Sequence, residues 1–124
     1  MAAKFDLEER TEKFAKEARS FVKKLPRTLS NFEDVKQLVR ASGSVAANYI
    51  EANEALSKKD FFFRIKICRK ESKEARLFLR LLDLKNDQNL KADADKLVLE
   101  ASEFILIFNH ILKSDSSNKK GNSD

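Results

Sequence analysis

The chain has 124 residues, of which 36% are charged and 42% are hydrophobic, and its formal net charge is +5. Two Gly, one Pro and no Trp leave few turn formers among many helix formers, so we expect one all-α domain. A single cysteine, Cys68, excludes an intramolecular disulfide. The sequence also has no apolar N-terminal run typical of a signal peptide and no segment of about 20 apolar residues that could span a membrane. These features predict a cytoplasmic protein.

The positive charge is concentrated in residues 57–85, which carry ten basic and four acidic side chains. Residues 1–56 are nearly balanced, and residues 86–124 have a small acidic excess. An anionic partner is therefore expected to bind within residues 57–85, if the protein has one.

The first predicted helix covers residues 7–25. Asp6 can serve as its N-cap, and Glu9 completes a capping box three residues further on. Pro26 cannot donate a helical hydrogen bond and disfavours helical dihedrals at the residue before it, so the helix is expected to end there. The expected core positions are Leu7, Phe14, Ala18, Phe21, Val22 and Leu25.

The second predicted helix covers residues 32–56, with Ser30 or Asn31 as its N-cap. Gly43 in its middle costs about 1 kcal/mol relative to Ala, and small residues surround it, so we expect another helix to approach closely there. The expected core positions alternate steps of three and four, as in a bundle: Phe32, Val35, Val39, Ser42, Ala46, Tyr49, Asn53 and Leu56.

The third predicted helix covers residues 58–84 and begins at a capping box formed by Ser57 and Asp60. Its expected core positions are Phe61, Ile65, Cys68, Ser72, Ala75, Leu79 and Leu82. The helix also carries a second apolar row, which comprises Phe63, Ile67, Phe78 and Leu81, with Glu71 and Glu74 between them. This second apolar row has to be covered either by another helix or by a partner subunit.

The fourth predicted helix covers residues 90–113, with Asp87 or Asn89 as its N-cap. The polar residues 114–124 have nothing to bury and are expected to form a disordered tail. Four amphipathic helices joined by short links predict an up-down-up-down antiparallel four-helix bundle over residues 1–113. The expected core positions of the last helix are Leu90, Ala94, Leu97, Ala101, Phe104, Phe108 and Ile111, widened by Val98, Ile105 and Leu112.

Two stretches resemble a known family of bacterial four-helix bundles. These are QLVRASGSVAANYIEA in the second helix and KKDFFFRIKICRKESKEARLFLRLL in the third, and they are similar to the 23S rRNA intervening sequence protein family, also called the S23 family. The specific positions are Ser44, Asn48, Glu51, Asp60, Phe61, Glu71, Glu74 and Leu79. The resemblance implies a homopentameric ring without an established catalytic activity. The stretch from Ala75 to Leu82 also resembles the accessory protein of diversity-generating retroelements, which binds nucleic acid and reverse transcriptase.

Metal binding and nucleophilic catalysis find little support in the sequence. Each predicted helix carries a Glu-x-x-Glu pair, but di-iron bundles need Glu-x-x-His on two helices and this chain has one histidine, His110. Cys68 falls on a core position, where a free cysteine usually acts as a small hydrophobe. We therefore expect no cofactor, no metal and no enzymatic activity.

A polar cluster comprising Asn48, Glu51, Glu71 and Glu74 lies beside the expected core positions. Carboxylates flanked by Phe and Leu must be paired if they are desolvated, because an unpaired buried charge costs several kcal/mol. We favour a structural role, in which these residues join the second and third helices or bond across a subunit contact. A ligand pocket and ordinary solvated positions are the alternatives.

A basic row recurs along the third helix at steps of three and four and is about 21 Å long at about 1.5 Å per residue. It comprises Lys66, Arg69, Lys73, Arg76 and Arg80. A row of this kind can follow a phosphate backbone, although many lysine-rich helix faces are simply solvated. The sequence thus leaves two hypotheses: an oligomeric scaffold or interaction protein, and an accessory factor that binds RNA or DNA through the basic row.

Overall fold

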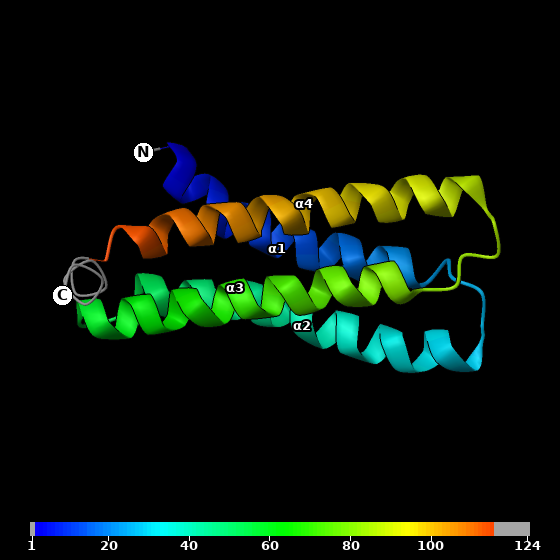
Figure 1. Cartoon of the computed structure of the whole chain (residues 1–124), viewed down its shortest axis with the longest axis horizontal. Coiled ribbons are helices and arrows are strands. Elements are labelled where there is room, and N and C mark those ends of the chain that lie inside the picture. Colours follow the sequence, from blue (N-terminus) through cyan, green and yellow to red (C-terminus); the bar gives the residue numbers. More distant parts are fainter. Residues whose placement is uncertain (1, 116–124) are drawn as a thin grey trace.

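Four antiparallel helices form the part of the chain that the computed structural model describes, residues 2–115 with side chains from residue 7 onward. They are α1 (Ala2–Val22), α2 (Leu29–Asn53), α3 (Lys58–Leu81) and α4 (Gln88–Lys113). The α1–α2 and α3–α4 connections lie at one end of the bundle, and the α2–α3 connection lies at the other (Figure 1). This arrangement confirms the predicted up-down bundle. Of the expected tail, 114–124, only residues 114 and 115 are among those described.

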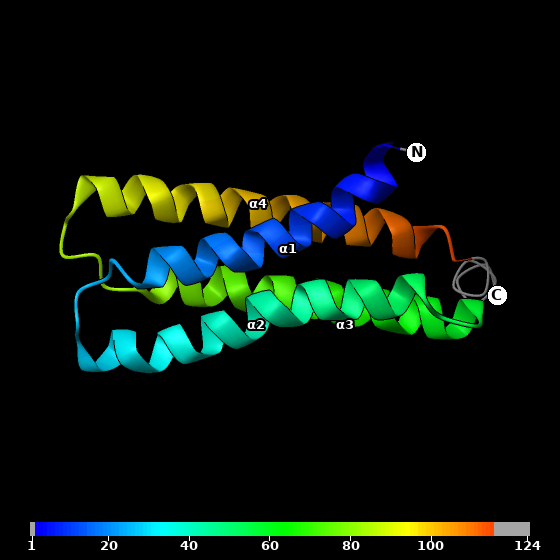
Figure 2. The same cartoon turned by 180° about the vertical axis from the view of Figure 1, so that it is seen from behind.

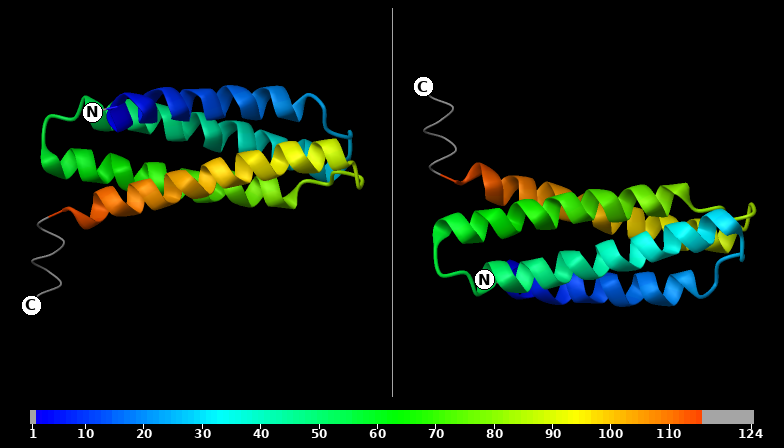
Figure 3. Two further views of the ribbon diagram at one scale, coloured as in Figure 1. Left: turned by 90° about the horizontal axis from the view of Figure 1, so that it is seen from above. Right: turned by 90° about the horizontal axis from the view of Figure 1, so that it is seen from below.

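Each helix packs mainly against the helices next to it in sequence, and α1 closes the bundle against α4. The packing of α2 against α3 is the most extensive, whereas that of α1 against α4 is the least. Figures 2 and 3 show the four helices running side by side from behind, from above and from below. The α2–α3 hairpin is therefore the main structural unit of the bundle.

The helix ends differ from the predicted ones most clearly at α1 and α2. α1 begins at Ala2, so Asp6 lies inside the helix and does not cap it, and it ends at Val22, before Pro26. Thr28, not Ser30 or Asn31, caps α2, because its side chain accepts a hydrogen bond from the Asn31 backbone N–H. Ser57 and Asp87 cap α3 and α4 through their side chains, as the sequence predicts.

The core positions of α2 agree only in part with the predicted ones: Ser42 and Tyr49 are buried and Val35 packs against the core, as expected. Phe32 and Leu56 were expected in the core, but they are 66% and 98% exposed. The buried positions of this helix are Asn31, Leu38, Ala41, Ser42, Val45, Tyr49 and Ala52. At several neighbouring pairs the buried residue is the one before the predicted position: Leu38 is buried in place of Val39, and Val45 in place of Ala46.

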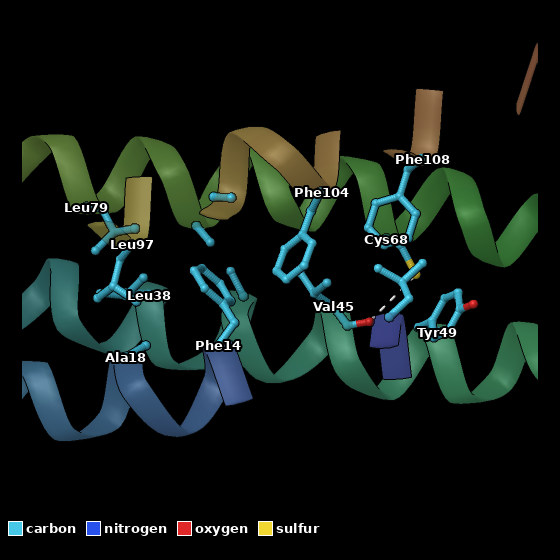
Figure 4. Packing of buried hydrophobic residues seen from close by; sticks show 14 of the residues in the cluster. Phe14, Ala18, Leu38, Val45, Tyr49, Cys68, Leu79, Leu97, Phe104 and Phe108 are labelled. Carbon is cyan, nitrogen blue, oxygen red and sulfur yellow. Dashed lines mark hydrogen bonds between the residues drawn. The ribbon is translucent and has the colours of Figure 1, made fainter. Parts of the chain in front are cut away.

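Large aromatic side chains fill the centre of the bundle (Figure 4). Phe14 of α1 and Phe104 of α4 are fully buried and meet edge to face, with ring centroids 5.4 Å apart. Tyr49 of α2 lies against Phe108 of α4, with ring centroids 6.2 Å apart. The core positions predicted for α3 are occupied by buried or half-buried side chains, from Phe61 to Leu82. An edge-to-face pair such as Phe14–Phe104 stabilises the core by more than the burial of its apolar surface alone.

The approach to Gly43 comes from a side chain. A Cβ built on Gly43 would lie 3.1 Å from Nη2 of Arg19, which reaches over from α1. The same guanidinium donates long hydrogen bonds to the Ser42 hydroxyl and the Val39 carbonyl, both at 3.4 Å. The expected close approach of another helix at Gly43 is thus made by α1, through the side chain of Arg19.

Candidate functional site

Two carboxylates of the polar cluster meet one arginine at the junction of α2 and α3. Nη1 of Arg40 lies 3.1 Å from Oε1 of Glu71, and Nη2 lies 2.6 Å from Oε1 of Glu74. The Glu71 side chain is only 7% exposed, whereas that of Arg40 is about half exposed, at 48%. Desolvation lowers the pKa of Arg40, but the charges and hydrogen bonds of Glu71 and Glu74 outweigh it and raise the pKa above its ordinary value. Arg40 therefore pairs with both carboxylates and ties α2 to α3, and Lys70 adds a second positive charge 3.8 Å from Glu71 and 4.0 Å from Glu74.

Asn48 makes a second connection between the same helices. Its Nδ2 donates to the Ser44 carbonyl at 2.9 Å and to the Ser44 hydroxyl at 3.0 Å. Its Oδ1 accepts a hydrogen bond from Nη1 of Arg64 on α3 at 3.0 Å. The amide thus bridges a carbonyl of its own helix and an arginine of the next one.

Glu51 stands apart from the other members of the polar cluster. Its side chain is exposed and makes no hydrogen bond or ion pair with the residues that the structure describes. The structure thus brings Asn48, Glu71 and Glu74 to the α2–α3 junction but leaves Glu51 outside. It adds Arg40 and Arg64, which sequence reasoning missed. The signal for Arg40 was the spacing of four that places Arg40, Ser44 and Asn48 on one flank of α2, whereas Arg64 lies on α3 and had no such signal.

Three hollows in the surface lie away from the polar cluster. The larger two, of about 680 and 400 Å³, are lined by the α3–α4 and α1–α2 connections at one end of the bundle. A third, of about 270 Å³, lies between α1 and α4 and includes Lys24 and Asp93 in its lining. None of the three is lined by a residue of the polar cluster, so they give no support to a ligand pocket there.

The basic row lies along the side of α3 that packs against α4. Nη1 of Arg69 donates to Oδ1 of Asn109 at 2.9 Å, and Nη1 of Arg76 donates to the Ser102 hydroxyl at 3.1 Å. The other three members, Lys66, Lys73 and Arg80, are exposed and form no ion pair within the described part of the chain. Two members of the row thus support the bundle, and three leave their charges in solvent.

The second apolar row runs along the outer side of α3. Its end members, Phe63 and Leu81, are 57% and 52% exposed. Ile67 and Phe78 between them are half-buried, and Phe78 packs against the core. The bundle itself therefore leaves part of this row uncovered.

Cys68 is fully buried in the core, where its Sγ donates to the Val45 carbonyl at 3.6 Å (Figure 4). Burial raises the pKa of the Cys68 thiol to about 12. Because the reactive form of cysteine is the thiolate, this residue cannot serve as a nucleophile near neutral pH.

Among residues 7–115 no group of three or more His, Cys, Asp or Glu side chains is arranged to hold a metal ion. No helix in the described region is long and apolar enough to cross a membrane.

The fold and these surfaces define a four-helix bundle in which Asn48, Glu71 and Glu74 of the polar cluster join α2 to α3 and line none of the three hollows. The model of the 23S rRNA-intervening sequence protein family matches residues 3–109, and the chain belongs to this family. It is also similar to a crystal structure of a protein with unknown function from the S23 ribosomal protein family of Bacteroides thetaiotaomicron VPI-5482. The TM-score is 0.73 at 22% sequence identity, covering 87% of this chain and 99% of that one, so this likeness shows the shared fold. A search of curated proteins found no significant match.

Proposed function

We propose that this protein is a non-enzymatic scaffold that assembles with copies of itself through the second apolar row of α3. The observation that carries this proposal is the exposure of Phe63 and Leu81, at 57% and 52%, at the two ends of that row. Their burial against a partner would stabilise an assembly by about 25 cal/mol per Å² of apolar surface removed from water. The family resemblance implies five copies arranged in a ring.

The polar groups beside the second apolar row, and the burial of Cys68, support the same proposal. Glu71 and Glu74 interrupt the second apolar row, but both pair with Arg40 and lie near Lys70, so a partner would not have to desolvate unpaired carboxylates there. Arg40 and Glu74 retain some exposure and could contribute polar contacts to the rim of such an interface. Cys68, the one cysteine of the chain, is buried and protonated, which argues against its acting as a nucleophile for covalent catalysis.

The test is the molar mass in solution, measured by light scattering after size exclusion. We expect five copies of the 14.2 kDa chain. Leu81→Lys should shift the population to smaller species, because a charge would have to be buried in the interface. Leu99→Lys is the matched control, since Leu99 is a similarly exposed leucine on α4 and should leave the mass unchanged. A monomer for the unmodified chain would overturn the proposal.

A further inference from the structure

The surface where α3 meets α4 combines the basic row with a second row of different chemistry. On α4, Leu99, Ser102, Leu106 and Asn109 recur at steps of three and four and so share one flank of the helix. The hydrogen bonds Arg69–Asn109 and Arg76–Ser102 place this row beside the basic row of α3. We call the surface formed by the two rows the α3–α4 face.

The side chains of the α3–α4 face that take no part in these hydrogen bonds are turned to solvent. Leu99 and Leu106 are 64% and 63% exposed in the middle of a helix. On the other row, Lys66, Lys73 and Arg80 are exposed and have no ion-pair partner among the residues described. Cations and leucines thus run in parallel along one surface.

The spacing within both rows fits a helix as the bound partner. The three free cations follow one another at intervals of seven residues, as do the two exposed leucines, which is about 10.5 Å at 1.5 Å per residue. Along a partner α-helix, every seventh residue likewise points to the same side. A helix with carboxylates along one edge and leucines along the next would meet the cations and the leucines of this face together.

The same chemistry argues against nucleic acid as the main ligand. Single strands bind to aromatic rings on which bases stack, whereas the exposed apolar side chains of this face are leucines. Arg69 and Arg76, the central arginines of the basic row, already donate to α4.

We propose that the α3–α4 face binds an acidic amphipathic helix of a partner protein. This site is separate from the second apolar row and does not depend on self-assembly.

The experiment uses a fluorescent, alanine-rich helical peptide that carries one row of Glu and an adjacent row of Leu, each at seven-residue spacing. Its binding to the full chain is followed by anisotropy at about 150 mM salt, where exposed charges are partly screened. We expect saturable binding that weakens about tenfold with Lys73→Glu and likewise with Leu106→Ser. Replacing the peptide's Glu residues by Gln should weaken binding in the same way.

Matched controls come from surfaces outside this face. Lys13→Glu on α1 repeats the charge reversal, and Ile50→Ser on α2 repeats the loss of an exposed apolar side chain. Both should retain full binding, and circular dichroism should show all four variants folded. An unchanged peptide affinity for the Leu106→Ser variant would overturn the proposal.

Two further measurements can also overturn it. Labelled RNA and DNA should bind weakly under the same conditions; if they bind tightly, and Lys73→Glu but not Leu106→Ser weakens them, the face is a nucleic-acid site instead. Light scattering of Lys73→Glu and Leu106→Ser should give the unmodified molar mass. A lower mass for these variants would show that a second copy of the chain covers the face.

Discussion

The side-chain amide of Asn31 on α2 hydrogen-bonds to both backbone polar groups of Asp83, just beyond the end of α3. Its Nδ2 donates to the Asp83 carbonyl at 2.8 Å, and its Oδ1 accepts from the Asp83 N–H at 2.8 Å. Nδ2 also donates to the Pro26 carbonyl at 3.0 Å. One buried side chain, 2% exposed, thus holds the α1–α2 connection against the α3–α4 connection.

Asn31→Ala should destabilise the bundle by about 2–3 kcal/mol, because it leaves several partly buried backbone groups without partners. Urea unfolding followed by circular dichroism would measure the change. Asn31→Asp should also destabilise, since a carboxylate can still accept from the Asp83 N–H but cannot donate to the two carbonyls. The exposed Asn89 provides the control, and Asn89→Ala should stay within about 0.5 kcal/mol of the unmodified protein.

Gly43→Ala should stabilise the protein by about 0.5–1 kcal/mol. Alanine has the better helix propensity, and the atom that its Cβ would meet at 3.1 Å is the far end of Arg19, an exposed and flexible side chain. The hydrogen bonds that Arg19 would lose are long ones of 3.4 Å. The midpoint of thermal unfolding should rise, whereas the reverse change at an exposed helical site, Ala47→Gly, should lower it. A fall in the midpoint of Gly43→Ala would mean that Arg19 cannot move aside.

Arg40→Ala should destabilise more than Glu71→Gln. Without Arg40, the nearly buried Glu71 carboxylate retains only Lys70, at 3.8 Å. The expected loss is about 1–2 kcal/mol, less than for a fully buried pair, because Arg40 is about half exposed and solvent screens it. In Glu71→Gln, by contrast, Arg40 keeps its ion pair with Glu74.

The measurement is the free energy of unfolding of Arg40→Ala and Glu71→Gln, with Lys36→Ala as the control. Lys36 pairs with Glu33 on the solvent side of α2, so its removal should have little effect. Equal losses for Arg40→Ala and Lys36→Ala would show that Glu71 does not need its arginine.

The Cys68 thiol should react with a disulfide reagent only when the bundle opens, because the native thiol is buried and protonated. Its pKa is raised to about 12, against about 8.5 for a cysteine in an unfolded chain. The folded state thus holds its proton more tightly than the unfolded state. The corresponding stability is fully present below about pH 8.5 and is lost as the pH rises towards about 12.

Comparing Cys68→Ala with the unmodified chain isolates this contribution from other groups that titrate in the same range. The unmodified chain should lose more stability between about pH 8.5 and 11 than the variant does. The reaction rate of the thiol at pH 8 should also increase with urea, in step with unfolding. Rapid labelling without urea would contradict the buried position of Cys68.

The sequence predicts the number, order and approximate limits of the helices because their apolar spacing is strong. The core of α3 was predicted well, since large apolar residues such as Ile65 and Leu79 fix its register. The core of α2 was predicted only in part, because neighbouring residues such as Leu38 and Val39, or Val45 and Ala46, fit two registers, and the structure buries Leu38 and Val45. Only the packing partner could decide between them.

The candidate surfaces were predicted in part. Spacing placed Glu71 and Glu74 on one flank of α3, but their partner Arg40 lies on another helix, and a helical period alone cannot pair two helices. The role of Asn31 was hidden for a similar reason, since its main partner Asp83 is 52 residues away in the sequence. The pairing of the basic row with the leucines of α4 likewise depends on how α3 and α4 lie against each other.

The uneven packing of the bundle also has a consequence for folding order. The α2–α3 contacts are the most extensive and join neighbouring segments of the chain, so closing that hairpin has a small entropic cost. α1 and α4 lie at opposite ends of the sequence, and their contact is the least extensive. We therefore expect the α2–α3 hairpin to form the folding nucleus and α1, although synthesised first, to dock against α4 last. Mutations along the α1–α4 contact should then mainly accelerate unfolding and leave the folding rate almost unchanged.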